Sequence, residues 1–308
     1  MRTASHWQDY EILDTGDGEK LERWQTARLV RPDPQIIWRT PRSPQWAAAD
    51  AAYLRSREGG GHWEFRKKLP ESWVIQYKGL SFRIRPTGFK HTGLFPEQAV
   101  NWDFLQSVIR SASRPVKVLN LFAYTGGATL ACAAAGASVC HVDASKGMVS
   151  WARDNAALSG LENSPIRWIV DDCKKFVERE LRRGNSYDII LMDPPSYGRG
   201  PGGEVWKLEE QVFDLVQLCA GALSDTPLLF LLNSYTTGLS PSVMSYVLET
   251  TVGRRFPGSA AADELGLPVT SSGLPLPCGS TAVYAFRPET LAAFRAGQAL
   301  PGQTPERE

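Results

Sequence analysis

The residues best suited to chemistry are glycines and acids that follow short apolar runs. One run, residues 116–121, passes into a turn of aromatic and small residues that ends at Gly126 and Gly127, and an alanine-rich helical pattern follows. A strand, a glycine turn and a helix N-terminus together favour a nucleotide-type site, because free backbone N–H groups and absent side chains let a ligand approach the chain. The spacing is not G-x-G-x-x-G, so the turn fits an ordinary NAD site poorly.

Two acids stand at the ends of later apolar runs. Asp143 ends the first of these, and a carboxylate there has two oxygens to accept the two hydroxyls of a ribose. Its alternative role is to cap the helix that follows. Asp193 ends the second run and precedes Pro194 and Pro195. The prolines fix φ and carry no N–H, so this strand end is stiff and its carbonyls stay available as acceptors.

The order and spacing of these motifs resemble class I S-adenosylmethionine (SAM) methyltransferases. In that family the first strand carries the cofactor turn, the second ends in an acid for the ribose, and the fourth ends in D/N-P-P. Within the family the chain is similar to the rRNA large-subunit methyltransferase-like branch, through Asn-Leu-Phe-Ala-Tyr-Thr-Gly at residues 120–126. Residues 89–98 and 198–206 also resemble bacterial methyltransferase sequence.

The resemblance implies that SAM is the cofactor and places its contacts on four segments. The expected cofactor-binding residues are Phe95, Gln98, Phe122, Ala123, Tyr124, Thr125, Gly126, Asp143, Ala144, Ser145, Asp172, Cys173 and Asp193. Asp172 is expected to receive the adenine amine. Asp171 is adjacent, which leaves the register open by one residue, and capping of the next helix is the alternative role.

The residues expected to act in methyl transfer are Asp193, Pro194 and Tyr197. Asp193 and a proline carbonyl can accept from a substrate amine, so that its lone pair faces the methyl group. Amine methyltransferases usually carry an aromatic residue directly after D-P-P, to stack on a flipped base. Ser196 stands there in this chain and Tyr197 comes one residue later, so Tyr197 is either a stacking residue or a packed wall.

The acceptor is predicted to be nitrogen or oxygen of a base, most simply in rRNA. Transfer to C5 of cytosine needs a cysteine nucleophile, and the end of the fifth predicted strand reads Asn-Ser-Tyr-Thr at residues 233–236. Cys278 is expected to be structural. Methylation of a small molecule or protein side chain, or a SAM-binding scaffold without catalysis, remain alternatives.

The elements that must position these residues alternate along the chain. Strands are predicted at residues 116–121, 138–143, 165–170, 187–192 and 228–233, and helices at 128–135, 146–158, 172–183, 206–223 and 241–250. This alternation predicts an α/β fold with a parallel sheet covered on both faces. The resemblance implies a Rossmann-like, seven-stranded sheet closed by a hairpin, with candidate strands at 261–266 and 281–286.

Three parts are predicted. Residues 1–85 form a small β-rich accessory domain, with strands at 10–14 and 27–31 and a hairpin of 74–77 with 80–84. Residues 86–296 form the methyltransferase domain, and the tail 297–308 is expected to be disordered. The glycine-rich residues 198–203 are either a lid or a simple surface loop.

Composition bounds the class of protein. The chain has 308 residues, of which 43% are hydrophobic and 22% charged, as in globular proteins. Its net charge of +1 gives no global signature of nucleic-acid binding, although a small basic excess in the first hundred residues leaves an RNA-facing surface open. Five scattered cysteines predict neither a metal site nor disulfides. No signal peptide and no apolar run of about 18 residues is found, so a cytoplasmic location without membrane contact is predicted.

Overall fold

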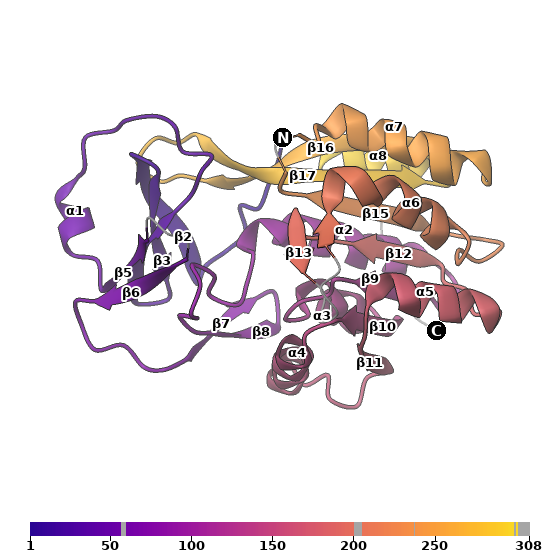
Figure 1. The fold of residues 1–308 in the computed structure, drawn as a ribbon, viewed down its shortest axis with the longest axis horizontal. Coiled ribbons are helices and arrows are strands. Elements are labelled where there is room, and N and C mark those ends of the chain that lie inside the picture. The colour runs from indigo at the N-terminus through magenta and orange to yellow at the C-terminus, as the bar shows by residue number, and fades with distance from the viewer. Residues whose placement is uncertain (57–59, 200–204, 237, 299, 301–308) are drawn as a thin grey trace, which may run out of the picture. The chain divides into compact units, whose positions relative to one another are not determined.

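The computed structural model describes residues 1–56, 60–199, 205–236, 238–298 and 300 (Figure 1). The chain forms two compact units. The first comprises Met1, Thr3–Ala99 and Leu265–Cys278, and the second comprises Arg2, Val100–Glu264 and Gly279–Glu308. The domain limits predicted above, 1–85, 86–296 and 297–308, stay a prediction. Most of residues 198–203, predicted to be either a lid or a surface loop, and most of the predicted disordered tail lie outside the described residues.

The first unit is built on a five-stranded sheet in the order β2-β3-β4-β5-β6 and a separate hairpin, β7–β8. Their bounds are β2 Tyr10–Gly16, β3 Glu19–Trp24, β4 Ala27–Pro32, β5 Ala51–Arg55, β6 Gly61–Phe65, β7 Trp73–Tyr77 and β8 Leu80–Ile84, with a short helix α1 at Pro44–Ala47. The predicted strands at 10–14 and 27–31 and the hairpin of 74–77 with 80–84 are confirmed. The segment Leu265–Cys278 belongs to this unit because Val269 bridges to Ile12, whose carbonyl also accepts from the Thr270 N–H at 2.9 Å.

Strand β3 was not predicted, because its sequence is rich in charge. Glu22 in the middle of β3 is fully buried, and its carboxylate accepts from the Arg31 guanidinium through two nitrogens, at 2.5 and 2.8 Å, and from the Tyr10 hydroxyl at 2.7 Å. A buried charge is tolerated when it is paired and hydrogen-bonded in this way. Hydrophobic periodicity therefore misses a strand whose central side chain belongs to a buried ion pair.

The second unit carries most of an eight-stranded sheet in the order β1-β16-β17-β15-β12-β9-β10-β11 (Figure 1). Five strands are parallel, namely β9 Lys117–Leu121, β10 Ser138–Asp143, β11 Ile166–Val170, β12 Ile189–Met192 and β15 Leu229–Ser234. The closing strands are β16 Ser259–Pro268 and β17 Pro275–Ala285, and β17 runs antiparallel to β15. The Rossmann-like, seven-stranded sheet is confirmed, with the two-residue β1 (Arg2–Thr3) added at its edge.

Helices alternate with these strands nearly as predicted. They are α2 Ala99–Ser111, α3 Gly127–Ala134, α4 Lys146–Leu158, α5 Cys173–Arg182, α6 Leu208–Ala220, α7 Pro241–Thr251 and α8 Pro288–Ala296, with 3-10 turns η1 Pro96–Gln98 and η2 Val252–Arg254. The helix predicted from residue 206 starts later, because β14 (Val205–Lys207) pairs with β13 (Tyr197–Arg199) instead. None of the helices in the described part of the chain is both long and apolar enough to cross a membrane.

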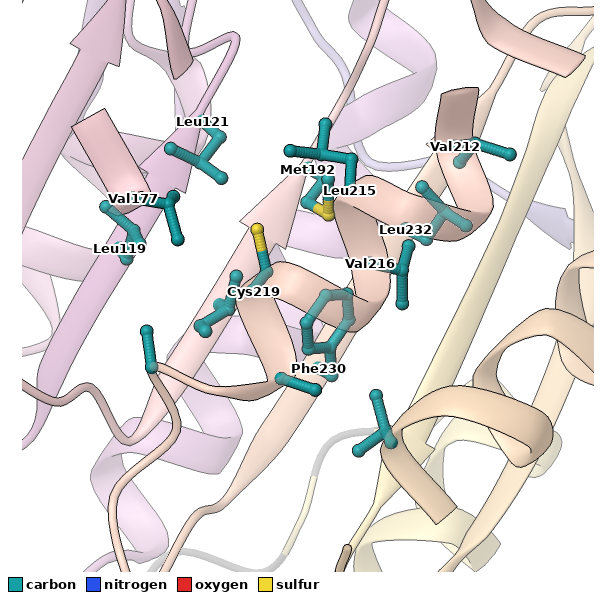
Figure 2. Packing of buried hydrophobic residues seen from close by; sticks show 14 of the residues in the cluster. Leu119, Leu121, Val177, Met192, Val212, Leu215, Val216, Cys219, Phe230 and Leu232 are labelled. Carbon is teal, nitrogen blue, oxygen red and sulfur yellow. The ribbon is translucent and has the colours of Figure 1, made fainter. Parts of the chain in front are cut away.

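The sheet of the second unit has an apolar core on each face, which follows from the period of two along its strands. Leu119, Leu121 and Met192 point to one face and pack with side chains of α5, α6 and α7 (Figure 2). The alternate residues Val118 and Leu191 point to the other face and pack with α2, α3 and α8. Burial on both faces fixes the strand ends rigidly, and those ends carry the residues singled out above.

Candidate active site

Four strand ends meet at one edge of the sheet in the second unit. Strands β12, β9, β10 and β11 are neighbours in that order and all parallel, so their carboxyl ends lie on the same edge (Figure 1). The chain continues from β9 to β10 and β11 on one side, whereas β12 lies on the other side. Such a point, where the strand order reverses, is where open α/β sheets bind ligands.

The turn after β9 has a strained backbone. Phe122 and Tyr124 have φ values of 55° and 50°, in the left-handed region that side chains disfavour. Two hydrogen bonds from the end of β10 hold them: the Ala123 N–H donates to the Val142 carbonyl at 3.1 Å and the Tyr124 N–H to Asp143 Oδ2 at 2.9 Å. Strain of this kind persists only where the surroundings enforce it, and it concentrates at functional sites.

Glycine is needed at the two positions of the turn for different reasons. Gly126 caps α3 with φ of 89°, a conformation that favours glycine. At Gly127 a Cβ would lie 2.6 Å from the Trp102 ring, which is buried, so the ring or the backbone would have to shift. Asn155, which is buried on α4, donates to the Thr125 carbonyl at 2.9 Å and so ties the turn to that helix.

Asp143 is positioned by two backbone N–H groups. Its Oδ2 accepts from Tyr124 and its Oδ1 from Ser145, at 2.9 and 2.8 Å. Burial raises the pKa of Asp143, and these two hydrogen bonds oppose the shift. Each carboxylate oxygen has a further lone pair, so both retain the capacity to accept from a diol. Capping of α4 falls to Ser145, whose Oγ accepts from the Met148 N–H at 3.4 Å.

The two acids after β11 have different partners. Asp171 forms an ion pair with Arg179 through Oδ2, and its Oδ1 accepts from the Asp172 N–H at 2.9 Å. Asp172 caps α5, with Oδ1 accepting from the Lys175 N–H at 2.9 Å, and its Oδ2 makes no hydrogen bond to any described residue. The capping role predicted as the alternative is thus confirmed, and the second oxygen keeps the predicted adenine contact open.

Cys173 joins the turn to α5 through its buried side chain. Its Sγ accepts from the Phe122 N–H at 3.4 Å. Burial raises the pKa of this thiol, so it stays protonated and serves packing. Cys173 stands at the first position of α5, and it stays among the residues predicted to bind the cofactor.

The end of β12 is tied to the hairpin β13–β14. Pro194 is buried, Asp193 is partly buried, and the Trp206 indole N–H donates to the Pro195 carbonyl at 2.6 Å. The Trp206 ring also lies 5.7 Å from the Phe122 ring, between centroids. Sequence reasoning missed this role of Trp206. The alternation of Tyr-Gly-Arg and Val-Trp-Lys around a glycine-rich run was the available signal for a hairpin.

Ser196, which stands where an aromatic residue was expected, is held by two segments. Its Oγ accepts from Thr236 Oγ1 at 2.5 Å, and its carbonyl accepts from the Leu208 N–H at 3.1 Å. Tyr197 is 53% exposed and pairs with Lys207 across the hairpin. The ring is therefore about half exposed, and both roles predicted for it, stacking on a base and packing as a wall, stay predictions.

Most of the predicted site residues lie on this edge. It brings together the backbone or side chains of Phe122, Ala123, Tyr124, Thr125, Gly126, Asp143, Ala144, Ser145, Asp172, Cys173, Asp193 and Pro194. Phe95 and Gln98 belong to the first unit, where the Phe95 ring packs 5.4 Å from the ring of His91 and Gln98 is buried. The roles predicted for all these residues stay predictions. Among the described residues, no three His, Cys, Asp or Glu side chains are grouped as a metal site requires.

Comparison with known proteins decides the family. A family model described as S-adenosylmethionine-dependent methyltransferase matches residues 35–210. This chain belongs to that family. A solved SAM-dependent methyltransferase from Agrobacterium tumefaciens is 40% identical, with a TM-score of 0.87, over 92% of this chain and 93% of that one. A methyltransferase structure complexed with S-adenosylhomocysteine (SAH) has a TM-score of 0.70 over 91% of this chain and 76% of its own, and at 20% identity it shows the fold alone.

Curated relatives carry names that specify a substrate. A protein of Chromohalobacter salexigens named ribosomal RNA large subunit methyltransferase K/L is 30% identical over 257 residues, which is 82% of this chain and 32% of the relative. One of Shewanella baltica with the same name is 36% identical over 120 residues, 39% of this chain and 16% of the relative. The chain thus spans between a sixth and a third of the length of these relatives.

The chain is therefore a SAM-dependent methyltransferase, and its site fits that cofactor. A sulfonium nucleoside needs a close backbone approach, a diol acceptor and an adenine acceptor. The strained turn with two glycines, the spare lone pairs of Asp143 and the second oxygen of Asp172 have these chemistries.

Proposed function

We propose that this methyltransferase acts on a nitrogen or oxygen of a base in RNA, with rRNA as the substrate class. The observation that carries the proposal is the stiff strand end Asp193-Pro194-Pro195 at the point where the strand order reverses. The names of the curated relatives support RNA as the polymer.

The hydrogen bonds at this strand end favour one pair of acceptors. The Pro195 carbonyl already accepts from Trp206, and we place the substrate amine at the Pro194 carbonyl and the Asp193 carboxylate. When bound, SAM supplies an electrophilic methyl group on a sulfonium centre. Two acceptors that hold the N–H groups of an amine direct its lone pair, and correct placement of two reactants supplies much of the rate. The amine proton passes to Asp193 or to solvent after transfer.

A cysteine-dependent route is disfavoured by the surroundings of two positions. At the end of β15, Asn233 Oδ1 accepts from Asn101 Nδ2 at 3.2 Å and from Thr281 Oγ1 at 2.6 Å. In the first unit, Cys278 Sγ donates to the Leu276 carbonyl at 3.3 Å, and burial raises the pKa of its thiol. A protonated thiol is a poor nucleophile, so these residues support a nitrogen or oxygen acceptor.

The test is transfer of labelled methyl from SAM to total RNA of a strain that lacks this gene, followed by mass spectrometry of rRNA nucleosides. One methylated base absent from the deletion strain and restored by the purified protein is the expected result. Asp193→Ala is the control and should remove transfer. Label found only in protein or small molecules would contradict an RNA substrate, and SAM binding without transfer to any acceptor would favour a scaffold.

A further inference from the structure

The first unit carries a row of aromatic side chains along its edge strand, β6. The Trp63 ring centroid lies 5.6 Å from that of Tyr53 in β5 and 6.4 Å from that of Phe65. The Trp63 indole N–H donates to the carbonyls of Thr87 and Phe89, at 2.9 and 3.3 Å. The loop after β8 is thereby brought to the same edge. We call Trp63, Phe65 and Phe89 the aromatic edge.

Two rings of the aromatic edge face solvent from a fixed backbone. Phe65 is 54% exposed and Phe89 is 69% exposed. The Thr87 hydroxyl holds the loop, because it donates to the His91 carbonyl at 2.8 Å and accepts from the Phe89 N–H at 3.2 Å. Rings presented on an ordered backbone lose little further freedom when a ligand stacks on them.

Cations surround the same edge. Arg55 ends β5 directly opposite Gly61 of β6, Lys90 follows Phe89, and Arg66, Lys67 and Lys68 follow Phe65 in the sequence. Carboxylates offset only part of this charge: Glu64 lies 3.7 Å from Arg66, and Asp50 lies 2.7 Å from Lys67. Among the described residues of these segments, cations therefore outnumber carboxylates beside the exposed rings.

The surroundings of Lys90 support this excess. Burial lowers the pKa of Lys90. The cations Lys20, Arg31 and Arg55 lower it further, and Asp33 opposes them. Lys20 and Arg31 are themselves paired with Asp33 and Glu22, so Lys90 and Arg55 are the cations that we place against an anion at this edge.

We propose that the aromatic edge and its cations bind a single-stranded segment of RNA, with bases stacked on Phe65 and Phe89 and phosphates at Lys90 and Arg55. Every base has a π face, and stacking on aromatic rings beside a cationic path is how proteins hold single strands. The inference deepens the proposed function and rests on it for the choice of RNA.

Binding is measured on the full chain without SAM, by fluorescence anisotropy of a short labelled oligoribonucleotide of mixed sequence. Phe65→Ala and Phe89→Ala should each weaken binding by about 5- to 100-fold. Lys90→Gln should lower the slope of log affinity against log salt by about 0.7. Matched controls are Tyr246→Ala, an aromatic 71% exposed on α7, and Arg182→Gln on α5, and both should bind like the wild type.

Folding of each variant is checked by its thermal midpoint, which should stay near that of the wild type because the replaced rings are exposed. Folded variants of the aromatic edge that bind RNA as tightly as the controls would overturn the inference, as would a wild type that fails to bind the oligoribonucleotide at low salt. Methyl transfer is measured in parallel. RNA binding that depends on the aromatic edge without any methylated RNA would support this inference and contradict the proposed function. Methylated RNA together with RNA binding that these variants do not change would support the proposed function and contradict this inference.

Discussion

Replacing Asp143 with asparagine tests its predicted role as the acceptor of the ribose hydroxyls of the cofactor. The carboxylate accepts from two backbone N–H groups, at 2.9 and 2.8 Å, through different oxygens. An amide has one acceptor oxygen, so one of those N–H groups would face an NH₂ group. A hydrogen bond to a charged partner contributes about 1.5–3 kcal/mol to stability. Because Asp143 is only partly buried, the free energy of unfolding of the variant should fall by an amount in the lower part of this range. One charge-assisted acceptor for the ribose diol is lost as well, so SAH should bind about 10- to 100-fold more weakly.

The assay pairs calorimetric titration of SAH with urea denaturation. Asp172→Asn is the matched control for the urea denaturation alone, since asparagine caps a helix as well as aspartate and α5 should keep its stability. Asp143→Asn protein that binds SAH within about twofold of the wild type, with an unchanged denaturation midpoint, would refute the assignment of Asp143 as the ribose acceptor.

Three further predictions concern stability, close packing and transfer. Burial alone would raise the pKa of Glu22, but Arg31 and Lys20 lower it from 4.5 to about 2, so the free energy of unfolding should fall as the pH drops from 4.5 toward 2. Glu22→Gln should flatten the dependence of the free energy of unfolding on pH and lower that free energy by about 3–5 kcal/mol at neutral pH. Urea denaturation at pH 7 and pH 3 measures both effects. Gly127→Ala should lower the free energy of unfolding by about 1–3 kcal/mol, because the added Cβ meets a buried ring at 2.6 Å; an unchanged melting temperature would contradict this. Trp206→Phe keeps a ring but loses the hydrogen bond to the Pro195 carbonyl. The kcat for RNA methylation should therefore fall about 5- to 10-fold while the Kd for SAH stays unchanged. An equal loss of kcat and of affinity for SAH would argue against a positioning role.

The sequence by itself determined the sheet of the second unit and the edge on which the site lies. Strand β10 and helix α4 have the predicted bounds, 138–143 and 146–158, because an apolar run and a helical period are local properties of the chain. Glycines, paired prolines and acids at strand ends are local too, so the turn, Asp143 and Asp193 could be placed in order without a structure. The family resemblance added the cofactor.

Only the tertiary structure decided which polar atoms are engaged. The ion pair between Asp171 and Arg179, and the hydrogen bond from Trp206 to the Pro195 carbonyl, depend on partners brought close by folding. The buried pair of Glu22 and Arg31 likewise allows a charged segment to form an interior strand of the first sheet. Hydrophobic periodicity reports which side chains leave water, whereas a hydrogen bond depends on the distance and direction between two specific atoms. That geometry exists only once distant segments have packed together.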